Sequence, residues 1–67
     1  MKITKDLEGK TILMQYKTMF ASINAIIHEV HVIRLSESGD YIEFRHINSY
    51  DTQWKPIDGI EILEILE

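Results

Sequence analysis

The fold of this chain is decided by the stretch VIRLSESGDYIEF, residues 32–44. Two apolar arms flank a polar connection, residues 36–40, in which Gly39 can take the positive φ that a four- to five-residue hairpin connection requires. The pattern predicts a β-hairpin with arms at residues 30–35 and 41–46.

The second arm of this hairpin alternates between apolar and polar side chains. Ile42, Phe44 and His46 occupy one set of alternate positions, and Tyr41, Glu43 and Arg45 occupy the other. Because successive side chains of a strand point to opposite faces, Ile42 and Phe44 are expected in the core, and the second set is expected to face water.

Three further strands are predicted on either side of the hairpin. They are an apolar run at residues 11–16, a short strand at residues 52–54 that Pro56 ends, and the isoleucine-rich segment 60–67. Residues 56–59 (Pro-Ile-Asp-Gly) read as a tight or 3₁₀ turn before the last strand. The glutamates at intervals of three in residues 60–67 also suit a helix, which is the alternative there.

Residues 18–30 have two interpretations. Met19, Phe20 and Ile23 begin a series of apolar residues at steps of three and four, which would lie on one face of a helix with Thr18 as its N-cap. The segment is also rich in β-branched side chains and runs directly into the hairpin, which favours a long strand from about Asn24 to Leu35. We favour the strand, with an α+β fold containing a helix near residues 18–30 as the alternative.

Five strands in so short a chain are best accommodated by an all-β small barrel, in which closure hides the edge strands. The hairpin VIRLSESGDYIEF, the turn QWKPIDG and the closing IEILEIL together resemble the SH3-like barrel over about residues 10–66. The resemblance implies a turn of 3₁₀ helix before the last strand. It fixes no activity, since the fold serves peptide binders, methyl-lysine readers, RNA-binding rings and structural subunits.

Length and composition limit what the chain can be. A chain of 67 residues forms a single domain, residues 1–67, and with no cysteine its hydrophobic core must provide nearly all its stability. The missing cysteines also exclude disulfides and fit a reducing compartment, so we expect a cytoplasmic location. No apolar run approaches the roughly 20 residues that cross a bilayer, so no membrane partner is expected.

The charge balance argues against generic DNA binding. Seven basic and eleven acidic side chains give a net charge of −4, whereas duplex-binding domains usually carry a basic surface. Positive charge is concentrated in residues 1–20, where a local patch could form from Lys2, Lys5, Lys10 and Lys17. The last ten residues carry a net charge of −4.

The candidate catalytic and metal-ligating residues do not form a recognisable motif. The sequence His28-Glu29-Val30-His31 lacks one residue of the zinc-protease spacing. On a strand, His28 and His31 would face opposite sides, so we predict no metal site from them. Ser36 and Ser38 are expected to form the hairpin connection, the carboxylates show no paired arrangement, and the glycines form no phosphate loop. We therefore predict a protein that is not an enzyme and has no cofactor.

Aromatic side chains with polar tips are the best indication of function. Tyr16, Tyr41, Tyr50 and Trp54 tolerate a wet surface, and such residues are enriched where proteins bind partners. The resemblance implies an aromatic-lined groove for extended, proline-rich ligands near Trp54.

We expect a non-catalytic interaction module that uses these four side chains to bind a protein partner or a copy of itself as a homo-oligomer. One alternative is a small barrel that binds single-stranded nucleic acid or RNA through stacking on aromatics. A further alternative is a phage or mobile-element accessory protein that inhibits a host factor.

Overall fold

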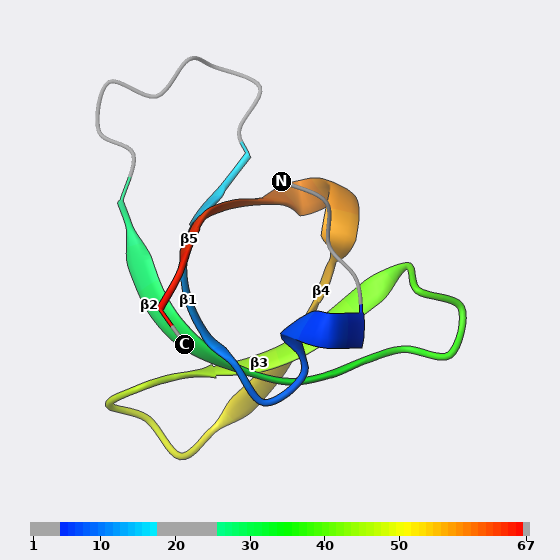
Figure 1. The fold of residues 1–67 in the computed structure, drawn as a ribbon, viewed down its shortest axis with the longest axis horizontal. Coiled ribbons are helices and arrows are strands. Elements are labelled where there is room, and N and C mark those ends of the chain that lie inside the picture. Colours follow the sequence, from blue (N-terminus) through cyan, green and yellow to red (C-terminus); the bar gives the residue numbers. More distant parts are fainter. Residues whose placement is uncertain (1–4, 18–25, 67) are drawn as a thin grey trace.

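The computed structural model describes residues 5–17 and 26–66 and shows a single curled β-sheet (Figure 1). Five strands and two turns of 3₁₀ helix follow one another along the chain: η1 (Lys5–Leu7), β1 (Thr11–Tyr16), β2 (His28–Leu35), β3 (Tyr41–His46), β4 (Thr52–Pro56), η2 (Ile57–Gly59) and β5 (Ile60–Ile65). The fold is mostly β, as the sequence predicts, with η2 directly before the last strand.

The strands form one antiparallel sheet in the order β4-β3-β2-β1-β5. The first four strands are consecutive neighbours, and β5 returns to pair with β1, so the sheet curls into the ring-like outline of Figure 1. β4 and β5 are the two edge strands, and the sheet is not closed. The predicted five-stranded all-β fold is therefore confirmed, whereas the predicted closure of the sheet is wrong.

A short connection joins the two edge strands. β4 ends at Pro56, which has no amide hydrogen to donate to a neighbouring strand, and η2 turns the chain from one edge of the sheet to the other within three residues. A single backbone bond from Lys17 N–H to Gly59 O, 2.9 Å long, ties η2 to the end of β1.

The predicted hairpin is confirmed as β2 and β3. Gly39 has φ of 80° in the connection, and its N–H donates to the carbonyl of Ser36 at 3.0 Å. Ser36 Oγ accepts a hydrogen bond from the Tyr41 N–H at 3.1 Å, and Ser38 Oγ accepts one from the Asp40 N–H at 3.3 Å. Both serines thus stabilise the turn, as expected from the sequence.

The concave face of the sheet holds the hydrophobic core. Ile42 and Phe44 are fully buried there, as their alternation predicts. The buried core residues are Leu7, Ile12, Met14, Val30, Val32, Leu35, Ile42, Phe44, Ile60 and Ile62. Every strand except the edge strand β4 contributes to this core, and η1 adds Leu7.

Two irregularities in the ladders accompany the curvature. The register shifts between Val32 and Arg34 in the β2–β3 pairing, and between Leu13 and Met14 in the β1–β5 pairing. Bulges of this kind bend a strand and increase its twist. They allow a five-stranded sheet to wrap around its own core, which is covered by no α-helix within residues 5–17 and 26–66.

Where the structure describes the two ambiguous segments, it shows strand or irregular backbone and no α-helix. Ile26 and Ile27 precede β2 without regular structure, and β2 begins at His28 rather than near Asn24, so the predicted strand starts about four residues too early. The described part of the helical alternative, residues 26–30, contains no helix, and its remainder lies outside the described residues. The last segment is strand from Ile60 to Ile65, and its predicted end at residue 67 is outside the described part.

Candidate functional site

Of the four predicted binding residues, the structure places Tyr41 and Trp54 on one surface. Both lie on the convex face, Tyr41 on β3 and Trp54 on β4, and they are 49% and 47% exposed. Tyr41 pairs with Pro56 and Glu43 pairs with Trp54, so the two aromatic residues are diagonal neighbours across the ladder. Diagonal neighbours lie about 7–8 Å apart, within reach of one bound segment.

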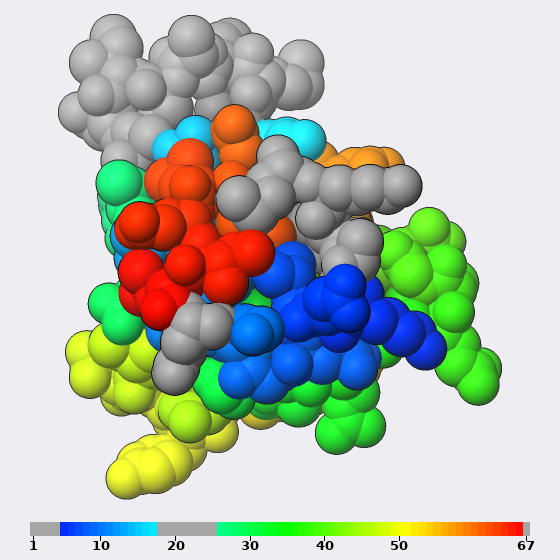
Figure 2. All heavy atoms as spheres, viewed as in Figure 1, coloured from blue at the N-terminus to red at the C-terminus, as the bar shows by residue number. Residues whose placement is uncertain are grey.

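The other two predicted residues lie elsewhere. Tyr50 is fully exposed in the connection between β3 and β4, which projects from the body of the molecule in yellow in Figure 2. Tyr16 is on the concave side, half-buried and packed against the core, where burial raises its pKa above the ordinary tyrosine value. The predicted aromatic surface therefore reduces to Tyr41 and Trp54.

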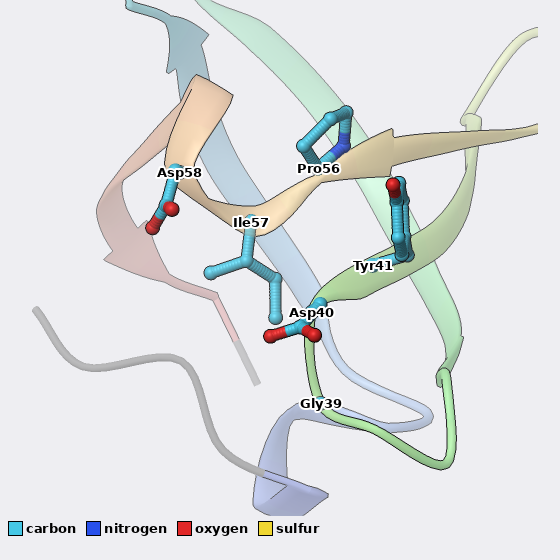
Figure 3. A pocket seen from close by; sticks show the side chains of 6 residues that line it. All are labelled: Gly39, Asp40, Tyr41, Pro56, Ile57 and Asp58. Carbon is cyan, nitrogen blue, oxygen red and sulfur yellow. The ribbon is translucent and has the colours of Figure 1, made fainter.

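A pocket of about 300 Å³ adjoins Tyr41 (Figure 3). It is lined by Gly39, Asp40, Tyr41, Pro56, Ile57 and Asp58. A hydrogen bond of 2.9 Å from the Ile57 N–H to the Asp40 carbonyl joins η2 to the hairpin connection. It holds together the two segments that line the pocket. In Figure 3 the Ile57 side chain lies between the Asp58 and Asp40 carboxylates, and Pro56 and the Tyr41 ring lie beyond it on the right.

The charges that line the pocket favour a cationic ligand, whereas Arg45, on the same face of β3, donates from Nη1 to the Ser49 carbonyl at 3.4 Å. Arg34 Nε lies 2.9 Å from a carboxylate oxygen of Glu43, the residue opposite Trp54, and this is the one ion pair within residues 5–17 and 26–66. Lys55, on β4 between Trp54 and Pro56, directs its ammonium group to the opposite face, 5.7 Å from the centre of the Tyr16 ring. The Asp40 and Asp58 carboxylates thus give the pocket a negative potential.

A second group of polar side chains lies on the concave face at the end of the core. His28 on β2 and His46 on β3 meet with 3.0 Å between His28 Nδ1 and His46 Nε2. The Gln53 amide nitrogen is 3.4 Å from His46 Nδ1, and the Tyr16 ring packs against His28 with ring centres 4.8 Å apart. We call Tyr16, His28, His46 and Gln53 the histidine cluster; all four are half-buried.

One arrangement of hydrogens satisfies the whole histidine cluster. The Gln53 amide donates to Nδ1 of His46, which leaves the hydrogen of a neutral His46 ring on Nε2, and Nε2–H donates to Nδ1 of His28. A proton added to Nδ1 of His28 would set one N–H against another. Burial lowers the pKa of His28 below the ordinary histidine value, and the charge of His46 adds to this effect.

The stability of the protein is therefore expected to fall as the pH falls from 7.5 to 5.5. The pKa of His28 is lower in the folded chain than the ordinary value of about 6.5 in the unfolded chain, so below pH 7 the unfolded state takes up more protons. Urea unfolding monitored by circular dichroism would measure the free energy of unfolding at each pH. The range lies above the pH at which most carboxylates titrate. His28→Gln should flatten the dependence and His31→Gln should keep it; equal slopes in both variants would contradict this assignment.

His31 serves as the control for His28 because it lies on the opposite face of the sheet. Its Nδ1 is 3.5 Å from Thr11 Oγ1, and it alternates with the buried Val30 and Val32. The predicted separation of His28 and His31 onto opposite faces is confirmed. The pairing of His28 with His46 was not predicted from the sequence, although the alternation that buries Phe44 also places His46 on the concave side.

The described part of the chain offers little support for the nucleic-acid alternative. Lys10 and Lys17 lie just beyond the two ends of β1, and a six-residue strand spans roughly 20 Å, so they do not form one patch with each other. Lys5 lies in η1, and Lys2 is outside the described residues.

Comparisons with known proteins identify no relative. No family model, no curated protein and no solved structure matches this chain. The helices within residues 5–17 and 26–66 are single 3₁₀ turns, and none is long and apolar enough to cross a membrane. The geometry of the Tyr41–Trp54 face and of the histidine cluster is therefore the basis for inferring a function.

Proposed function

We propose that this chain is a non-catalytic interaction module that binds an extended segment of a partner protein on the convex face of β3 and β4. The observation that carries the proposal is the position of Tyr41 and Trp54, about half exposed, on adjacent strands beside the pocket of Figure 3. We further propose an SH3-like assignment for the fold, supported by the order of elements and by the 3₁₀ turn η2 before β5.

The chemistry of this face suits a segment with a basic side chain. Tyr41, Trp54 and Pro56 provide flat apolar surface at small conformational cost, and aromatic residues of this kind dominate binding energies at many interfaces. The Asp40 and Asp58 carboxylates at the neighbouring pocket attract a lysine or arginine, whose aliphatic stem would pack along Tyr41.

Selection from a phage-displayed library of random dodecapeptides tests the proposal. The full chain is the bait, and selected peptides are then measured by fluorescence polarisation. We expect peptides with a basic residue to be enriched and to bind at least about tenfold more weakly to Trp54→Ala and Tyr41→Ala. Tyr50→Ala removes an exposed aromatic residue away from the surface and should leave affinity unchanged.

Two results would count against the proposal. The first is a selection that yields no binding peptide. The second is a set of peptides whose affinity is the same for wild type, Trp54→Ala and Tyr41→Ala, with all three proteins folded by circular dichroism. Light scattering on a size-exclusion column distinguishes self-association, because an oligomer that dissociates in Trp54→Ala would identify a second copy as the occupant.

A further inference from the structure

The histidine cluster has a geometry that the proposed interaction surface does not use. The two nitrogens His28 Nδ1 and His46 Nε2 are 3.0 Å apart on adjacent strands. Two nitrogen donors that each lie about 2.0–2.1 Å from one metal ion are about 2.9 Å apart at a right angle and about 3.3 Å apart in a tetrahedral arrangement. The observed separation falls within this range.

We propose that His28 and His46 form a two-nitrogen site for a late first-row transition-metal ion, with Cu²⁺ held most tightly. Imidazole nitrogen is a preferred ligand of copper, nickel and zinc, and affinity for a given set of ligands rises toward Cu²⁺ in this series. Mg²⁺ and Ca²⁺ prefer oxygen ligands and would not bind.

Aromatic rings pack against both histidines of the pair. The Tyr16 ring packs on His28, and the Phe44 ring meets His46 edge to face with centres 5.9 Å apart. The rings themselves are 5.0 Å apart at 71°. To bind one metal ion, each ring would have to turn about its final side-chain torsion, which has a broad energy well, so that both nitrogen lone pairs face the ion.

Metal binding also requires a local rearrangement of hydrogens. His46 Nε2 must give up its hydrogen, so the neutral ring takes the form with the hydrogen on Nδ1. Gln53 accommodates this by turning its amide, so that the oxygen rather than the nitrogen faces His46 Nδ1. A hydrogen bond of this kind to the second ring nitrogen is the usual way in which proteins orient a metal-bound histidine.

The site has two protein ligands, and each must be a neutral imidazole when it binds the metal. Within residues 5–17 and 26–66, no group of three or more histidine, cysteine, aspartate or glutamate side chains could hold a metal ion. The site is therefore an open one that water completes, unlike a structural zinc site with four protein ligands.

Isothermal titration of the full chain with CuCl₂, NiCl₂ and MgCl₂ at pH 7.5 in a non-coordinating buffer tests the proposal. We expect one equivalent of Cu²⁺ to bind more tightly than Ni²⁺, and no binding of Mg²⁺. His28→Gln and His46→Gln should each weaken Cu²⁺ binding by at least about tenfold, because each removes one of two protein ligands. His31→Gln, the same change on the opposite face, should bind as the wild type does.

A second measurement keeps the test decisive where a variant fails to fold. In the wild-type chain, the histidine side-chain resonances followed by NMR during addition of Zn²⁺ should shift for His28 and His46 together and not for His31. Cu²⁺ binding that persists unchanged in folded His46→Gln, or resonance shifts confined to His31 or to the amino terminus, would overturn the proposal. So would a wild-type chain that binds no Cu²⁺.

Discussion

Phe44→Ala is expected to unfold most of the protein at 25 °C. Phe44 is a fully buried side chain at the centre of β3 and contacts both the core and the edge of the His46 ring. Truncation of a buried phenylalanine to alanine costs about 3–5 kcal/mol, and a core of this size seldom provides more than about 3–5 kcal/mol of net stability. The variant thus loses about as much free energy of unfolding as the fold possesses.

Circular dichroism and the dispersion of amide resonances would measure this loss. Phe44→Leu keeps most of the apolar volume and should remain folded with a lower urea midpoint. Tyr50→Ala removes an aromatic ring that is fully exposed, so its stability should stay within about 0.5 kcal/mol of wild type. A Phe44→Ala protein with a midpoint near wild type would show that the concave face is not the stabilising core.

Leu7→Ala is expected to cost about 2–4 kcal/mol, the second largest effect. Leu7 is 3% exposed and is the core residue that η1 contributes. The segment around it is fastened to β2 by three hydrogen bonds: Gly9 N–H to Val32 O at 2.9 Å, Val32 N–H to Lys10 O at 2.8 Å, and Leu35 N–H to the Glu8 carboxylate at 2.9 Å. Leu7 therefore covers part of the core with a side chain whose backbone is held in place.

The matched control for this change is Leu63→Ala on β5. Leu63 is 39% exposed, so the same loss of three carbons should cost less than about 1 kcal/mol. Urea unfolding of both variants gives the comparison directly. If the two changes cost the same, η1 does not contribute to the core, and the fold begins at β1.

Residues 5–10 contain a core residue, Leu7, whose burial was not predicted from the sequence. Leu7 is a single apolar residue among charged neighbours, and a 3₁₀ turn of three residues has no periodic signal. The segment that carries Leu7 is held against a distant strand, because the Lys10 carbonyl and the Glu8 carboxylate accept hydrogen bonds from the Val32 and Leu35 N–H groups. A contact of this kind depends on how distant strands curve.

The candidate site was also predicted only in part. The sequence identified Tyr41 and Trp54 as surface aromatics, and the alternation in β3 correctly placed Tyr41 outside. Alternation could not place Tyr16 or Tyr50 relative to them, because that depends on the order of strands in the sheet and on the position of a turn. The same limit applies to the histidine cluster, whose two histidines are 18 positions apart in the chain.

The sequence by itself determined the strands, the hairpin connection with its glycine of positive φ, and the face on which each residue of β3 lies. These features follow from local rules, since a strand alternates every residue and a turn selects its residues within a few positions. Only the tertiary structure decided that the sheet stays open, that Leu7 joins the core, that Tyr41 and Trp54 share a surface, and that His28 meets His46. Those outcomes depend on the register and curvature of strands paired across long stretches of chain, which no local pattern encodes.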